Sequence, residues 1–128
     1  MILLDTHAWL WWAGHRDRLP AKLRRRLERE RSLAVSAISA WEAARLVDRG
    51  RLRFRVEPRI AIRGALAVAG LEIMPVTDAI ALEAGLLGGA LHGDPADRII
   101  LATAIDLHAI LVTKDERLQR SGLVDTLW

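Results

Sequence analysis

The chain contains no cysteine and no tyrosine among its 128 residues. The lack of cysteine excludes disulfide bonds and thiolate metal sites. No apolar run approaches the ~18 residues that a membrane-spanning helix needs, although 52% of the residues are hydrophobic. The apolar start has no basic leader and carries Asp5, so we expect no secretory signal peptide. We therefore expect a cytoplasmic protein without membrane association, folded as one domain over residues 1–128.

Lysine is also scarce, so the sequence pI of about 10.5 overstates the basicity of a chain with a formal net charge of only +3. The charge is unevenly distributed. Residues 15–31 carry eight Arg or Lys against three acids, and residues 45–63 carry seven Arg against two acids. Basic segments around an acidic remainder suit a polyanion that arginines hold by its phosphates. The alternative is an arginine-rich surface that is merely solvated.

Apolar runs of strand length alternate with segments of helical period. We expect strands at residues 2–5, 33–35, 71–76, 109–113 and 124–128, and helices at residues 6–13, 20–31, 37–49, 58–69, 78–88 and 95–108. The expected N-caps are Thr6, Ser36, Thr77 and Asp94, and the expected left-handed residues after helices are Gly50 and Gly70. This order predicts an α/β fold with a mostly parallel sheet covered on both faces. Such sheets bind ligands beyond the C-terminal ends of their strands.

Two acids lie at the predicted ends of strands. Asp5 directly follows the first apolar run, and Asp115 follows Thr113 by two residues. Each acid has an alternative role, because a carboxylate at this position can cap the helix that comes next. At the first site Thr6 is a second possible cap.

Two further acids lie on predicted helices. Glu42 shares a helix face with apolar residues, and a surface ion pair with Arg45 or Arg49 is its alternative role. Asp97 heads an apolar stripe in the first helical turn and therefore points toward the sheet edge. Its alternative is stabilisation of the helix dipole, worth ~0.3 to 1 kcal/mol. Asp94 suits the cap position, although it could also touch a metal.

A sheet of this kind could bring all four acids to the same edge. Crowded carboxylates repel one another unless a cation lies among them. Oxygen ligands without histidine or cysteine select Mg²⁺ or Mn²⁺. We therefore predict a divalent metal site formed by Asp5, Glu42, Asp97 and Asp115.

Four stretches of the sequence together resemble one known family. They are "MILLDTHAWLWW", "SAISAWEAARLVDRGRL", "LHGDPADRIILATA" and "ILVTKDERL". In order and spacing they are similar to PIN-domain proteins, specifically the VapC-type toxins of bacterial toxin-antitoxin pairs. The resemblance implies a three-layer α/β/α domain and a metal-dependent endoribonuclease that a cognate antitoxin inhibits. It places the family's catalytic, metal-binding acids at Asp5, Glu42, Asp97 and Asp115, with small hydroxyl residues at Thr6 and Thr113.

The resemblance also implies RNA as substrate and an antitoxin whose C-terminal segment meets apolar surface around residues 37–69. We expect a homodimer as well, partly because the early helices carry a surplus of apolar and Trp residues. One rival is a catalytically inactive RNA-binding or partner-binding module with the same fold. Another is a receiver-like signalling domain, which would need a second acid beside Asp5.

Three tryptophans, Trp9, Trp12 and Trp41, raise the question of base stacking. Two of them lie three residues apart on one predicted helix, which favours core or interface packing. Arg98 follows the third acid, and we favour a local contact over a phosphate contact. His7 and His92 have no ligand partner at helical spacing, so we assign neither a role.

Overall fold

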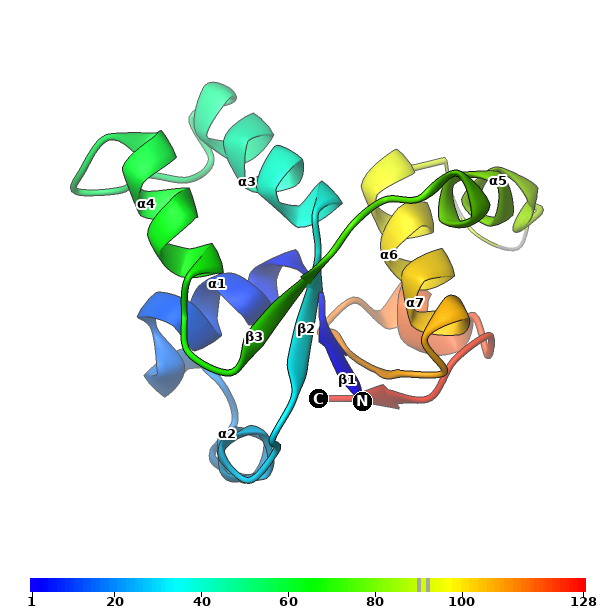
Figure 1. Ribbon diagram of the computed structural model, residues 1–128, viewed down its shortest axis with the longest axis horizontal. Coiled ribbons are helices and arrows are strands. Elements are labelled where there is room, and N and C mark those ends of the chain that lie inside the picture. Colours follow the sequence, from blue (N-terminus) through cyan, green and yellow to red (C-terminus); the bar gives the residue numbers. More distant parts are fainter. Residues whose placement is uncertain (90, 92) are drawn as a thin grey trace.

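A single parallel sheet organises the computed structural model, which describes residues 1–89, 91 and 93–128 (Figure 1). Its strands are β1 (Ile2–Leu4), β2 (Leu33–Ser36), β3 (Leu71–Met74), β4 (Ile110–Val112) and β5 (Thr126–Leu127). Their spatial order is β3-β2-β1-β4-β5, and every neighbouring pair is parallel. This order reverses direction between β1 and β4, which creates a crevice at their C-terminal ends. A receiver-like domain would instead have the order 2-1-3-4-5, so that rival is excluded.

The predicted helices are all present, with ends that differ by a few residues from the predicted ones. They are α1 (Thr6–Gly14), α2 (Ala21–Glu28), α3 (Ile38–Asp48), α4 (Pro58–Leu66), α5 (Asp78–Leu86), α6 (Pro95–Asp106) and the short α7 (Glu116–Arg120). A 3₁₀ turn over Arg16–Arg18, which the sequence did not indicate, joins α1 to α2. Within the described part of the chain, no helix has both the length and the apolar character needed to cross a membrane.

Alternating side chains of the sheet build two cores, one on each face. On one face Ile2 and Leu4 pack in a cluster with Trp9 and Trp12 of α1. On the other face Leu3 and Leu111 pack in a cluster that contains Ile100, Leu101 and Leu118. Figure 1 shows α1, α2 and α4 on one side of the sheet and α5, α6 and α7 on the other. The predicted three-layer α/β/α fold is therefore confirmed.

Helix α3 occupies the edge where the strands end, because it contacts α1 and α4 on one side and α6 on the other. Local backbone signals behave mostly as predicted. Gly50 and Gly70 adopt positive φ angles of 69° and 78°, which glycine tolerates at helix ends. Thr77 and Asp94 cap α5 and α6 as predicted.

Two predicted N-caps were wrong. The cap of α1 is Asp5, because the fully buried Thr6 hydroxyl is hydrogen-bonded to Ser39 at 2.9 Å instead. The N-cap of α3 is Ala37, although the Ser36 hydroxyl one residue earlier accepts the Ile38 N–H at 3.2 Å.

Candidate active site

The four predicted acids line one hollow at the C-terminal edge of the sheet. Its volume is about 500 Å³. Helix α1, the loop after β4, and helices α3 and α6 contribute to its walls. The lining residues are Asp5, Thr6, His7, Trp11, Glu42, Arg51, Asp94, Asp97, Ile100, Lys114, Asp115 and Arg117. Asp94 thus joins the four acids, which the sequence alone left open.

Asp5 is held rigidly at the end of β1. Its N–H donates to the carbonyl of Val112 at 3.0 Å, and its Oδ1 accepts the Ala8 N–H at 2.8 Å. Only 8% of the residue is exposed. The capping role that we weighed for Asp5 is therefore present, and it fixes the carboxyl group beside the crevice between β1 and β4.

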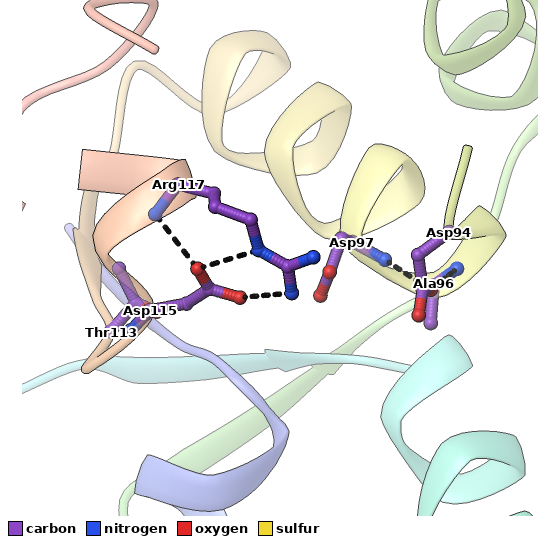
Figure 2. Close-up of polar contacts among 6 residues, drawn as sticks. All are labelled: Asp94, Ala96, Asp97, Thr113, Asp115 and Arg117. Carbon is purple, nitrogen blue, oxygen red and sulfur yellow. Dashed lines mark hydrogen bonds and ion pairs between the residues drawn. The ribbon is translucent and has the colours of Figure 1, made fainter. Parts of the chain in front are cut away.

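Asp115 reaches the same hollow from the loop after β4 and caps α7. Its Oδ1 accepts the backbone N–H of Arg117 at 2.8 Å, and the guanidinium donates to Oδ1 and Oδ2 at 3.3 and 3.0 Å. Figure 2 shows the Arg117 side chain extending past Asp115 toward Asp97. The buried hydroxyl of Thr113 links the two strand-end acids, because it accepts the Asp115 N–H at 3.0 Å and hydrogen-bonds with Asp5.

Glu42 faces the hollow from α3 and is partly buried. The Thr6 hydroxyl, which donates its proton to Ser39, lies close enough to lower the pKa of Glu42 against the larger effect of burial. Arg45, one of the surface partners that we considered for it, pairs instead with Asp48 at 3.3 Å. The side chain of Glu42 is thus oriented toward the acids of α6.

Three carboxylates form the tightest group in this hollow. Oxygen atoms of Glu42, Asp94 and Asp97 all lie within 4.8 Å of one another. Asp94 reaches this position as the cap of α6, with its Oδ1 accepting the N–H groups of Ala96 and Asp97 at 2.9 and 3.2 Å (Figure 2). Asp5 and Asp115 line the same hollow without belonging to this triad.

The crowding of these acids perturbs their protonation. Burial, followed by the charges of Asp94, Glu42 and Asp115, raises the pKa of Asp97 from 3.8 to about 7. Burial also raises the pKa values of Asp5 and Glu42. By contrast, the Arg117 guanidinium lowers the pKa of Asp115. Three carboxylates are therefore crowded together where the triad lies, and the raised pKa of Asp97 reflects both their burial and their proximity.

This donor set fits a hard divalent cation. Carboxylate oxygens are the ligands that Mg²⁺ and Mn²⁺ prefer, and the sequence contains no cysteine to compete. Burial and then repulsion raise the pKa of Asp97, and a cation among Glu42, Asp94 and Asp97 would offset the repulsion. The residues of the hollow therefore fit the divalent cation, Mg²⁺ or Mn²⁺, that we predicted from the sequence.

The rim of the hollow carries cations and an aromatic ring that the sequence analysis did not single out. Lys114 lies over the Trp11 ring, with its Nζ 5.6 Å from the ring centroid, and Arg51 also lines the hollow. Sequence patterns could not separate Trp11 from Trp9 and Trp12, because Trp11 is itself partly buried and packs against the same core cluster.

The other tryptophans and Arg98 lie outside the acidic hollow. Trp9 and Trp12 are 0% and 5% exposed, so their predicted core packing is confirmed, whereas Trp41 is 50% exposed. Arg98 makes local contacts, as we favoured: its guanidinium donates to four backbone carbonyls at the end of α5 and in the loop that follows. His92 lies outside the described residues.

With the fold and the acidic site established, sequence comparison identifies the class of protein. Residues 2–122 match the PIN domain family. The chain therefore belongs to the PIN-domain family.

Within this family the chain is similar to VapC proteins. It is 37% identical over 118 residues to Ribonuclease VapC22 of Mycobacterium tuberculosis, with 92% of this chain and 89% of that protein covered. A chain of VapBC2 from Rickettsia felis, solved with a DNA fragment from its promoter, has the same fold, with a TM-score of 0.72, 20% identity, and coverage of 99% and 98%. The DNA-bound VapBC of Salmonella typhimurium gives a TM-score of 0.73 at 16% identity, covering 98% of this chain and 96% of that one.

Proposed function

We propose that this protein is a metal-dependent endoribonuclease that acts as the toxin of a toxin-antitoxin pair. The observation that carries the proposal is the convergence of five carboxylates in one hollow at the switch point of the sheet, three of them with oxygens within 4.8 Å of one another. The similarity to a protein named Ribonuclease VapC22 supports RNA as the substrate.

In this proposal the acids have different roles according to their positions in the hollow. Glu42, Asp94 and Asp97 would hold Mg²⁺ or Mn²⁺, and Asp5 and Asp115, the other two predicted ligands, would extend the acidic site toward β1 and β4. When bound, the metal lowers the pKa of a water molecule and polarises the phosphodiester. The Thr113 hydroxyl keeps Asp5 and the loop of Asp115 oriented, and the Thr6 hydroxyl ties α1 to Ser39 of α3 beside Glu42.

Cations around the acids would hold the RNA backbone. Lys114 and Arg51 line the hollow itself, and Arg18 and Arg53 line the adjoining one, so phosphates on either side of the scissile bond have positive partners. This arrangement would account for part of the uneven charge of the sequence, because Arg18, Arg51 and Arg53 lie around a centre of carboxylates.

The adjoining hollow also supports an antitoxin partner. It has a volume of about 830 Å³ and lies between α1, the loop after α3, and α4, with Leu10, Leu46 and Phe54 among its apolar lining. A partner segment laid in this hollow would end beside the acids, where an arginine could bind carboxylates bidentately. We place this protein in the cytoplasm, where it would encounter both RNA and the antitoxin.

A homodimer remains part of the proposal, but with a different motivation. Trp9 and Trp12 of the early helix lie in the core and are not available to a partner. Exposed apolar side chains occur instead on the edge strand β3 and on α5, namely Ile73, Leu82 and Leu86, with 48%, 63% and 70% exposure. Sedimentation of the isolated chain at micromolar concentration tests this directly, and a monomer would contradict it.

The central test is RNA cleavage by the purified protein with and without a divalent cation. Cleavage should require Mg²⁺ or Mn²⁺ and should stop when EDTA is added. A catalytically inactive binding module would instead bind RNA or a partner without cleaving. For the toxin role, expression of this chain alone should arrest growth, and co-expression with the adjacent gene product should restore it; harmless strong expression would refute that role.

A further inference from the structure

We propose that the indole ring of Trp11 is the stacking surface for one unpaired nucleobase of the RNA, beside the phosphate that lies over the carboxylates. The inference rests on the proposed ribonuclease function and assigns a nucleobase subsite to it. It thereby makes unpaired RNA the substrate, because a base that is paired and stacked inside a duplex cannot present its face to a side chain.

Trp11 differs from its two neighbours on α1 in the surface it presents. Trp9 and Trp12 are buried in the core, whereas Trp11 is only partly buried. Its side chain lines both the acidic hollow and the larger adjoining hollow. An aromatic ring at the junction of two hollows can be reached by a flat ligand whose charged part lies among the acids and cations.

The ring is also held in place before any ligand arrives. Trp128 lies 5.7 Å from it, centroid to centroid, at an interplanar angle of 52°, and His7 lies 6.3 Å away in an edge-to-face arrangement. A ring already fixed by two aromatic neighbours loses little conformational freedom when a base stacks on it.

The charges around Trp11 favour a nucleotide over an uncharged aromatic ligand. The Nζ of Lys114 lies 5.6 Å from the ring centroid, and Arg51 lines both hollows. A nucleotide joins a flat base to an anionic phosphate, so one molecule satisfies both the ring and the cations. Base stacking on aromatic side chains tolerates any base, because each base has a π face.

The test measures binding of a labelled RNA of about ten nucleotides by fluorescence anisotropy. An Asp97→Asn background in Mg²⁺ keeps the RNA intact, which a gel verifies. An abasic nucleotide is placed at each position in turn. At one position the missing base should weaken binding by roughly 10-fold, in line with the worth of one stacked base. That penalty should vanish in Trp11→Leu and largely return in Trp11→Phe, which restores an aromatic face.

Trp41→Leu is the matched control, because Trp41 is an exposed tryptophan that does not line the acidic hollow as the described residues define it. It should keep the full penalty. Circular dichroism verifies that each variant is folded. If the RNA binds but the abasic penalty persists unchanged in both Trp11 variants, the stacking role is refuted while the ribonuclease proposal stands. If the Asp97→Asn protein binds no RNA and the unsubstituted protein cleaves none, the proposed function fails and the subsite fails with it.

Discussion

Replacing Asp97 by asparagine should stabilise the metal-free protein at neutral pH while it removes a metal ligand. The pKa of Asp97 rises from 3.8 to about 7 in the folded state. Such a shift corresponds to about 4 kcal/mol if nothing screens it. Because Asp97 is partly exposed, solvent screening reduces this to roughly 1 to 2 kcal/mol. Asparagine also loses the helix-dipole contribution of ~0.3 to 1 kcal/mol, so the net gain is about 1 kcal/mol.

The gain should depend on pH in one direction. Between about pH 4 and pH 7 the folded protein binds a proton at Asp97 more tightly than the unfolded chain does. The unsubstituted protein therefore loses stability as the pH rises through this window, and the asparagine variant does not. At pH 4 the two proteins should unfold at nearly the same temperature. At pH 8 the variant should have a Tm higher by about 4 °C.

The assay is thermal unfolding followed by circular dichroism in EDTA, across pH 4 to 8 with ~0.15 M salt. Asp78→Asn is the control, because Asp78 is an exposed acid in the first turn of α5 and shares the dipole contribution without the crowding. That control should lower the Tm slightly at pH 8. Addition of Mg²⁺ should raise the Tm of the unsubstituted protein more than that of Asp97→Asn. A Tm difference that does not change with pH, or a variant that melts like the control, would refute the reasoning.

Three further predictions follow from contacts in the site and beside it. Arg117→Gln removes the guanidinium that occupies Asp115, so calorimetric titration should find Mg²⁺ bound about 2- to 5-fold more tightly, the range expected for an exposed ion pair; Arg120→Gln on the same short helix should leave the affinity unchanged. Arg98→Ala leaves four carbonyls without their donor and should lower the free energy of unfolding in urea by about 2 kcal/mol, with only partial recovery in the lysine variant; an unchanged midpoint would contradict this. Asp5→Asn keeps a good N-cap while removing a buried charge, so RNA cleavage should collapse although the Tm holds or rises; full activity in the folded variant would remove Asp5 from the mechanism.

Much of the fold follows from short-range patterns in the sequence. The apolar runs of β1 and β4 and the period of α6 reflect interactions within a few residues, as do the caps Thr77 and Asp94. The position of Asp5 and Asp115 at strand ends was readable for the same reason. At Asp5 and Thr6, two adjacent residues could both cap α1. The sequence could not show which one does, because the Thr6 hydroxyl bonds to Ser39 of another helix.

The assembly of the site depends on tertiary packing. Glu42 meets Asp94 and Asp97 only because α3 crosses the sheet edge and contacts α6. The sequence left open whether Asp94 would join this triad, and it did not indicate that Asp115 would be paired with Arg117. Trp11 was indistinguishable from its core neighbours until the packing of α1 turned its ring toward the hollow. Helical period and capping are set by residues close in the chain, whereas the distance between carboxylates on different elements is set by how those elements pack.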